Sequence, residues 1–186
     1  LKSMTGAFFH DGSFSSFRGR SHGGPVDPQR QKPWQFVTYT QNHDQVGNRA
    51  TGDRFPQTLS TDRLILVAAL LLTQPYTPMI FQGEEFLEGE WFRDTVPLHW
   101  DQQDEFTGIF RMYSDLVGLR LNKEGHTKGL TGQHVDTLHL NPDNHIYAFH
   151  RWADGGAGDD VVVAVNLDSK TWGDYTVGMP AAGHWV

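Results

Sequence analysis

The amino-acid sequence contains no cysteine. Disulfide bonds and thiolate-ligated metal sites are therefore excluded, and cysteine usage does not report on the redox compartment. The absence is compatible with the bacterial cytoplasm, where we expect the protein to act. Long apolar runs are missing as well, because the longest, residues 64–72, is far shorter than the ~20 residues that cross a bilayer. We therefore expect no membrane partner.

Basic charge is scarce. The 186 residues include 15 Lys and Arg against 22 Asp and Glu, a net charge of −7 with His neutral. Without a basic patch, binding to nucleic acid is not expected. The ten His are scattered without the spacing of a helical metal pair, and no Gly-rich segment ends in the Lys-Ser/Thr of a phosphate-binding loop. We therefore expect no metal ion and no cofactor.

Aromatic residues, by contrast, are abundant. Twelve Phe, six Trp and five Tyr make up 12% of the chain, and hydrophobic residues make up 38%. This composition is typical of a folded protein with a large core, or with a surface that stacks on flat apolar ligands. The length fits one large domain or two small ones. Because the chain begins at Leu1 and ends at Val186 inside strand-like sequence, we expect it to be a piece of a longer protein.

Strands and helices alternate in the pattern predicted for residues 1–122. The strand segments are apolar, with β-branched and aromatic residues in the first. The first helix segment is rich in Leu and Ala, begins after Ser60 or Thr61 and ends before Pro75, whereas the second has the apolar period of an amphipathic helix. Residues 1–32 show no such period and read as a loop with at most one helical turn. The predicted segments are 34–40 and 79–82 for the strands and 63–73 and 106–121 for the helices.

The pattern changes after Gly125. Short strand-like runs follow one another and are separated by turns rich in Asn, Asp, Gly and Pro. We therefore expect an antiparallel all-β region at residues 123–186. The predicted strands are 135–140, 146–152, 161–167 and 175–177.

Polar residues follow each of the two strands predicted in the first region. Asn42, His43 and Asp44 follow the first strand, and Glu84 and Glu85 follow the second. In parallel α/β folds, ligands bind at the carboxyl ends of the strands, where carboxylates serve as acids, bases, nucleophiles or stabilisers of a cationic transition state. An imidazole beside a carboxylate donates to a hydroxyl-rich ligand or tunes the pKa of the acid. The alternatives are a capping or solvated turn for the His-Asp pair and a solvated helix start for the two Glu residues.

Two tryptophans and two arginines offer weaker indications. Trp91 and Trp100 suit packing in a core or an interface, and sugar stacking stays open for both. Arg18 and Arg20 suit anion binding, but their loop is rich in Ser and Gly, so that solvent exposure is the default expectation.

Residues 36–44 carry a resemblance to a known family. They resemble the strand-seven motif of the α-amylase superfamily of glycoside hydrolases, an apolar strand that ends in Asn-His-Asp. The resemblance implies that Asp44 is the carboxylate that stabilises the transition state and that His43 hydrogen-bonds hydroxyls of the reacting sugar. It also implies substrate-binding roles for Asn42, Gln45, Arg49 and, in the loop after the second strand, Glu85.

Further segments resemble two branches of this superfamily. The run 41–49 and the upstream runs 10–12 and 16–20 resemble malto-oligosyltrehalose trehalohydrolases, whereas 91–100 and the β region resemble glucan branching enzymes. The implied fold is strands seven and eight of a (β/α)8 TIM barrel with their helices at residues 1–122, followed by an antiparallel β-sandwich, truncated, at residues 123–186. A complete barrel takes ~250 residues.

The resemblance also implies a function, and it implies that part of the site lies elsewhere. No segment resembles the motifs of the family's nucleophile Asp or acid/base Glu, both of which a retaining mechanism needs, so we expect this chain alone to be inactive. For the full-length enzyme we expect hydrolysis of the α-1,4 bond next to the terminal trehalose unit of maltooligosyl trehalose. Transfer of a cut α-1,4-glucan chain to make a branch is the alternative reaction. A non-catalytic glucan-binding module is the alternative from a different class.

Overall fold

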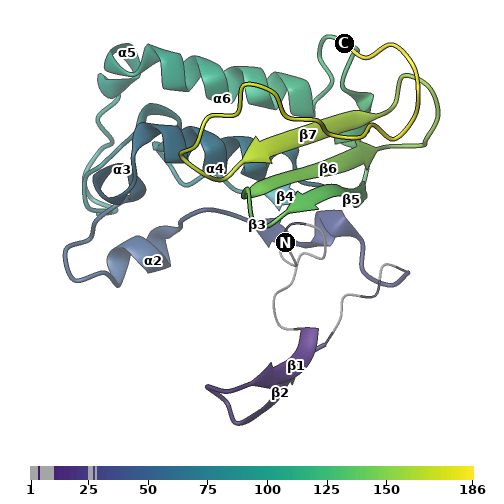
Figure 1. Ribbon diagram of the computed structural model, residues 1–186. Coiled ribbons are helices and arrows are strands. Elements are labelled where there is room, and N and C mark those ends of the chain that lie inside the picture. Colours follow the sequence, from purple (N-terminus) through teal and green to yellow (C-terminus); the bar gives the residue numbers. More distant parts are fainter. Residues whose placement is uncertain (1–3, 5–10, 25–26, 28) are drawn as a thin grey trace.

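The computed structural model describes residues 4, 11–24, 27 and 29–186 (Figure 1). Its helices α4 and α6 lie side by side. A parallel strand pair lies at one end of α4, and an antiparallel sheet packs against α4. The elements are β1 Asp11–Ser15, β2 Arg20–Gly23, η1 Pro33–Gln35, β3 Val37–Thr38, α2 His43–Gly47, α3 Phe55–Thr58, α4 Thr61–Thr73, β4 Thr77–Pro78, η2 Glu84–Phe86, α5 Gln102–Glu105, α6 Thr107–Arg120, η3 Lys128–Thr131, β5 His134–Asn141, β6 Ile146–Trp152 and β7 Val161–Asn166.

Strands β3 and β4 pair in parallel, but both are shorter than the sequence indicates. The amide of Thr77 donates to the carbonyl of Phe36 at 3.0 Å, and that of Met79 donates to Thr38 at 2.8 Å. The prediction of a strand from residue 34 is wrong because Pro33 starts a 3-10 turn there. The second strand, Thr77–Pro78, lies just before the predicted segment 79–82. Pro78 has no backbone N–H, but a parallel pair uses the amides of alternate residues, so the pairing accommodates a proline at this position.

The predicted helices are confirmed with small changes at their ends. Helix α4 ends at Thr73 because Gln74, which precedes a proline, is forced into an extended conformation with ψ 159°. The second predicted helix, 106–121, corresponds to α6, and Phe106, with φ −105° and ψ 37°, separates it from the short helix α5, which was not predicted.

The carbonyl groups at the end of α4 are bound by Arg120 of α6. Its guanidinium donates to the carbonyls of Leu72 at 2.9 Å and of Gln74 and Tyr76 at 2.5 Å each. The last carbonyls of a helix lack partners within the helix and carry partial negative charge, so a cation is stabilising there. This contact fixes α6 against α4 and the start of β4.

A second buried arginine joins the sheet to the same helix end. Arg151 of β6 is fully buried and donates to the carbonyls of Thr73, Leu130 (3.2 Å), Gly132 (2.6 Å) and His134 (2.9 Å). Burial, followed by the nearby charge of Arg120, lowers the pKa of Arg151 to about 10. Among the residues that the structure describes, its hydrogen-bond acceptors are backbone carbonyls, and truncating it leaves several of them without a donor.

The sheet is antiparallel in the order β5-β6-β7, as predicted for the first three strands of the region. The central strand β6 is buried at residues 146–149. Tyr147 and Phe149 stack with centroids 5.6 Å apart and form a core cluster with Val165, against which Leu66 and Leu70 of α4 pack. The core thus lies between this sheet and α4.

The fourth predicted strand, residues 175–177, is wrong. That segment forms no ladder, although Tyr175 and Val177 are half-buried. The Tyr175 hydroxyl lies 2.8 Å from Nε2 of His139 and accepts from Nδ2 of Asn141 at 3.0 Å. Tyr175 is thus half-buried because its side chain contacts β5, and not because it belongs to a strand. The described residues contain one sheet here, and a β-sandwich stays a prediction.

The expectation of a loop at residues 1–32 is wrong for residues 11–23. Strands β1 and β2 form an antiparallel hairpin whose register shifts between Asp11 and Phe14. Its residues are largely exposed, including Phe14 and Phe17. The sequence therefore lacks the alternation of apolar residues that predicts a strand. Residue 10, part of the upstream resemblance, lies outside the described residues.

Apolar surface is exposed along β3. Val37 is 56% exposed and Tyr39 43%, and Ile65 on α4 is 37% exposed. Phe81, near β4, is buried instead, because the Arg54 guanidinium covers its ring at 4.6 Å and Phe92 packs against it at 5.6 Å.

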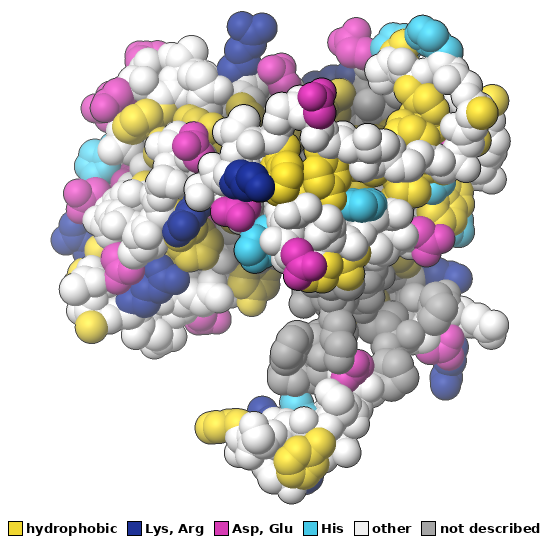
Figure 2. All heavy atoms as spheres, in the orientation of Figure 1, with side chains coloured by type: hydrophobic (Ala, Val, Ile, Leu, Met, Phe, Trp, Pro, Cys, Tyr) yellow, Lys and Arg dark blue, Asp and Glu magenta, His cyan; other side chains and the backbone are white. Residues whose placement is uncertain are grey.

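Acidic and basic side chains are interspersed on the face of the molecule that Figure 2 shows. Within the described ranges, no helix combines the length and apolarity of a membrane span.

Candidate functional site

The turn after β3 presents His43 and Asp44 side by side. Asn42 has extended geometry and its side chain accepts from the Gln45 amide at 2.9 Å, which caps the short helix α2. The first helical residues are His43 and Asp44, with Nε2 of the imidazole 3.4 Å from Oδ1 of the carboxylate. Their side chains are 64% and 74% exposed. Capping, the alternative function of this cluster, therefore falls to Asn42 and leaves the His-Asp pair accessible.

Two further residues predicted for this turn, Arg49 and Gln45, differ in their contacts. Arg49 donates to the Asp53 carbonyl at 2.8 Å, pairs with the Asp53 carboxylate at 3.5 Å and lies over the Phe55 ring at 5.4 Å. It therefore fixes the loop that follows α2. Gln45 is exposed beside the His-Asp pair on α2. His43, Asp44 and Gln45 are thus consecutive exposed residues of α2, Asn42 caps that helix, and Arg49 holds the loop after it.

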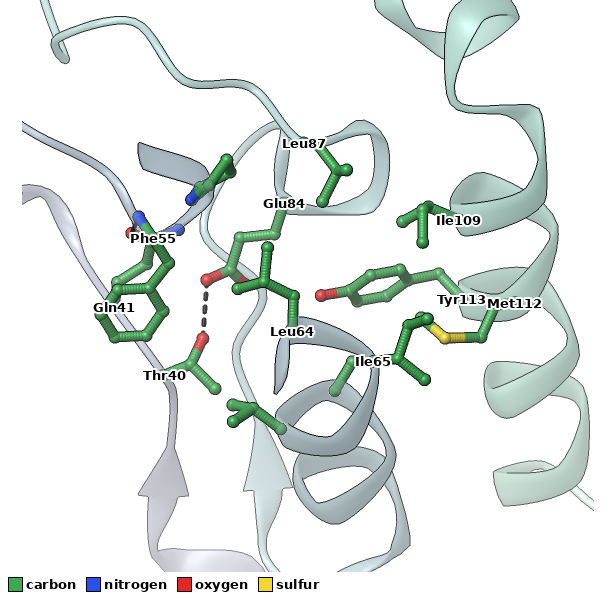
Figure 3. Close-up of a pocket in the computed structure, with 13 residues that line it drawn as sticks. Thr40, Gln41, Phe55, Leu64, Ile65, Glu84, Leu87, Ile109, Met112 and Tyr113 are labelled. Atoms are coloured by element: carbon green, nitrogen blue, oxygen red, sulfur yellow. Dashed lines mark hydrogen bonds between the residues drawn. The ribbon is translucent and has the colours of Figure 1, made fainter. Parts of the chain in front are cut away.

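Glu84 links the ends of the two parallel strands. It is 7% exposed and accepts from Oγ1 of Thr40 at 2.6 Å and from the Phe81 amide at 3.0 Å (Figure 3). Burial raises the pKa of this carboxyl, and the hydrogen bonds from Thr40 and Phe81 oppose the rise only in part. The expectation of a solvated helix start is wrong for Glu84, since its side chain turns under the loop to reach the carboxyl end of β3.

An apolar pocket closes over this carboxylate. Leu64 and Ile65 of α4 and Tyr113 of α6 point into it in Figure 3. Burial and the negative charges of Glu84 and Glu85 raise the pKa of the Tyr113 hydroxyl. The pocket is small and apolar, which suits a structural role for Glu84.

Glu85 lies on a different side of the loop. It is half-buried, and it lines a groove of about 370 Å³ together with Ile80 and residues of α6 such as Phe110 and Val117. Its Oε2 atom is buried and has no hydrogen-bond partner. Neither His43 nor Asp44 lines this groove.

Sequence reasoning missed a buried arginine that holds the loop after β4. Arg54 is 1% exposed and donates from Nε to the carbonyl of Glu90 at 2.8 Å and from a terminal nitrogen to that of Gln82 at 2.7 Å. Burial lowers its pKa, and the charges of Glu88 and Glu84 oppose this effect. In the sequence Gly-Asp-Arg-Phe, no pattern distinguishes this arginine from a surface residue.

Glu88 completes this network. It is 2% exposed and accepts from the amides of Glu90 at 2.8 Å and His99 at 2.9 Å, with Nδ1 of His99 at 3.2 Å. Burial acts to raise the pKa of Glu88, but these hydrogen bonds outweigh it and the pKa is lowered. At Gly83, φ is +86° and a Cβ would lie 2.4 Å from that of Glu88, so the loop requires glycine there. The result is a rigid loop.

Aromatic rings follow this loop. Phe92 packs near the imidazole of His43 with centroids 6.1 Å apart, and Trp100 contacts Phe86 at 5.0 Å while staying 59% exposed. Packing thus accounts for one face of Trp100. Among the described residues, no group of His, Asp and Glu has the arrangement of a metal site.

Comparisons with known proteins identify the relatives of this chain. Residues 138–186 match the family described as alpha amylase, C-terminal all-beta domain. The chain is 55% identical over 85 residues to a malto-oligosyltrehalose trehalohydrolase of Brevibacterium helvolum, covering 46% of this chain and 14% of that protein. It is 33% identical over 163 residues to the Mycobacterium tuberculosis protein of that name, strain CDC 1551 / Oshkosh, covering 64% of this chain and 28% of that protein.

A more distant relative is a 1,4-alpha-glucan branching enzyme of Corynebacterium jeikeium, 24% identical over 155 residues, covering 77% of this chain and 21% of that protein. A crystal structure of a Salmonella typhimurium protein assigned as an alpha amylase has a similar fold, with a TM-score of 0.72 at 24% identity, covering 90% of this chain and 35% of that one. The chain spans between 14% and 28% of these curated relatives. These matches confirm the resemblance to the α-amylase superfamily.

Proposed function

We propose that this chain is the C-terminal part of an α-glucan-active glycoside hydrolase. Its favoured reaction is hydrolysis of the α-1,4 bond next to the terminal trehalose unit of maltooligosyl trehalose. The observation that carries the proposal is the exposed pair of His43 and Asp44, in the turn after β3 and at the same end of the parallel pair as the loop after β4. The names of the relatives at 33% to 55% identity support the choice of reaction.

The chemistry of the pair suits this reaction. Cleavage of a glycosidic bond builds positive charge on the sugar ring, and a carboxylate such as Asp44 stabilises that charge. The neighbouring imidazole of His43 donates to a sugar hydroxyl and holds the ring beside the carboxylate. Gln45, exposed on the same helical turn, adds an amide that hydrogen-bonds hydroxyls in either direction. Glu85, for which substrate binding is implied, lies against α6, so its contribution is the weakest of the set.

Residues 1–122 then form the last two strands of a (β/α)8 barrel, and residues 123–186 form the C-terminal β domain. Parallel strands are normally covered on both faces and paired at both edges. Beside β3 lies a groove of about 370 Å³ lined by Val37, Tyr39 and α4, and beside β4 lies the groove of about 370 Å³ that contains Glu85. Neighbouring barrel strands from the rest of a longer polypeptide fit at these two places.

The nucleophile and the acid/base carboxyl belong to that remaining part of the barrel. A retaining glycosidase places these two groups on opposite sides of the scissile bond, and the chain supplies only the third carboxylate, Asp44. The chain by itself is therefore inactive, and the longer enzyme works in the cytoplasm on a maltooligosaccharide or α-1,4-glucan.

A branching reaction is the second candidate. It is favoured by the match to a branching enzyme, which extends over 77% of the chain but at only 24% identity. The two reactions share the same cleavage step and differ in whether water or a sugar 6-hydroxyl accepts the cut chain.

Product analysis tests the proposal and separates the candidates. The longer polypeptide that carries this chain is incubated with maltooligosyl trehalose and, separately, with unbranched α-1,4-glucan. Hydrolysis predicts free trehalose from the first substrate, and branching predicts new α-1,6 linkages in the second. The 186-residue chain is assayed in parallel and is expected to yield neither product. Absence of both products from the longer polypeptide leaves the non-catalytic binding module and contradicts the proposal.

A further inference from the structure

The indole ring of Trp91 lies with one face against Gly52. A Cβ built on Gly52 would lie 2.2 Å from Cγ, 2.3 Å from Cδ2 and 2.4 Å from Cδ1 of Trp91. Because these three ring atoms are nearly equidistant from the Cβ position, that position lies above the plane of the indole. Residue 52 therefore faces the flat side of the ring. Gly52 is buried, whereas Trp91 is 48% exposed. The indole therefore covers the glycine with one face and presents the other to solvent.

Both partners in this contact are held by hydrogen bonds. The carbonyl of Glu90, next to the tryptophan, accepts from the buried Arg54 at 2.8 Å. The Gly52 amide donates to the Arg49 carbonyl at 3.1 Å, which closes a turn. Gly52 has φ +63°, so any other residue there is strained as well as obstructed. A large aromatic ring fixed in advance loses little conformational entropy when it binds a ligand.

The segment that carries Trp91 also reaches the proposed reacting centre. Phe92, the neighbour of Trp91 in the sequence, packs 6.1 Å from the imidazole of His43. Gly52 belongs to the loop that follows α2, the helix that carries His43 and Asp44. The two loops that meet at this contact are thus the ones that follow β3 and β4. A rigid, half-exposed indole at this place has no packing function for its open face.

We propose that the open face of Trp91 stacks on a glucosyl ring of the α-glucan substrate, one or more units away from the sugar held by His43 and Asp44. A pyranose ring presents an apolar face of C–H groups, which binds well to a flat aromatic ring, and its hydroxyls stay in water at the edges. The inference rests on the proposed function, since it assigns a subsite to that substrate. Trp91 is then a substrate-binding residue that selects for chain length.

Steady-state kinetics of the longer polypeptide with maltooligosyl trehaloses of increasing length test this subsite. Trp91→Ala is expected to raise KM for the longer substrates roughly threefold to tenfold, the size of an aromatic face contact, with kcat within about twofold. Trp91→Phe, which keeps a smaller flat ring over Gly52, is expected to lie between. The matched control is Trp34→Ala, because Trp34 is 56% exposed but precedes β3 and so lies at its opposite end.

A second measurement covers the case in which Trp91→Ala does not fold. Trp91 fluorescence should change when a maltooligosaccharide binds, and the folded Trp91→Phe variant should lose that change. Equal KM values for the Trp91 and Trp34 variants at every length, or an unaltered fluorescence response in Trp91→Phe, overturn the stacking inference. Failure of the proposed function looks different, because Asp44→Asn would then retain normal trehalose release whatever the Trp91 variants do.

Discussion

The turn after β3 and the loop after β4 leave the same end of one parallel strand pair, yet a His-Asp pair of the first is exposed and two carboxylates of the second are buried. After β3, His43 and Asp44 are 64% and 74% exposed and contact each other. After β4, Glu84 and Glu88 are 7% and 2% exposed and accept hydrogen bonds from backbone amides. The buried carboxylates hold a rigid loop, whereas the exposed one is free to meet a ligand. Position at a strand end therefore does not decide whether a carboxylate is accessible to a ligand, and burial does.

Loss of the buried arginine should have the largest effect on stability. Arg54→Met keeps the aliphatic stem but leaves the carbonyls of Glu90 and Gln82 without their donor and removes a positive charge from Glu88 and Glu84. We expect a loss of about 3 kcal/mol in unfolding free energy. Thermal unfolding of the longer polypeptide measures this as a drop in Tm of several degrees. The control is Arg93→Met, at an exposed arginine of the same segment, which should leave Tm unchanged.

Removal of the Glu84 carboxyl comes next. Glu84→Ala leaves Oγ1 of Thr40 and the amide of Phe81 without an acceptor, which should cost about 2 kcal/mol. Glu84→Gln retains an acceptor of the same size and should lose less than half as much. An equal loss in both variants would show that the negative charge, and not the hydrogen bonds, is what this position needs.

The pH dependence of stability follows from the raised pKa of Glu84. Because the folded pKa lies above the ordinary value of 4.5, folding favours the protonated form. Stability from this group is fully present below pH 4.5 and is lost as the pH rises through the folded pKa. Unfolding midpoints measured across this range should fall with rising pH in the native enzyme, relative to Glu84→Gln. A difference of the opposite sign would contradict the assigned shift.

Changes at the exposed pair should affect stability least. Asp44→Asn alters a side chain that is 74% exposed and pairs with His43, and surface changes of this kind are usually within about 0.5 kcal/mol. Tm of the variant should match that of the native enzyme. A drop comparable to that of Glu84→Ala would mean that Asp44 is a structural residue and would remove the contrast between the two loops.

Local patterns in the sequence identified the helices and strands whose buried residues recur at regular intervals. The Leu- and Ala-rich run became α4, the alternating strands became β5 to β7, and the Asn-His-Asp cluster became a cap followed by an exposed pair. Arg54, Glu88 and Arg151 were not identified, because the partners of each are backbone groups or residues distant in the chain. The hairpin β1–β2 was missed because its residues are exposed and follow no apolar period. Polar contacts between residues far apart in the chain cannot be predicted from the pattern of neighbouring residues.

The most direct test of the account is trehalose release by Asp44→Asn and Glu84→Gln, assayed side by side in the longer polypeptide. If Asp44 stabilises the charge of the transition state, its variant should lose roughly 10²- to 10³-fold in kcat with an unchanged Tm. Glu84→Gln should retain most of its turnover and show its effect in Tm instead. Near-native turnover in Asp44→Asn, or a loss of turnover confined to Glu84→Gln, would contradict the assignment of the exposed carboxylate to catalysis.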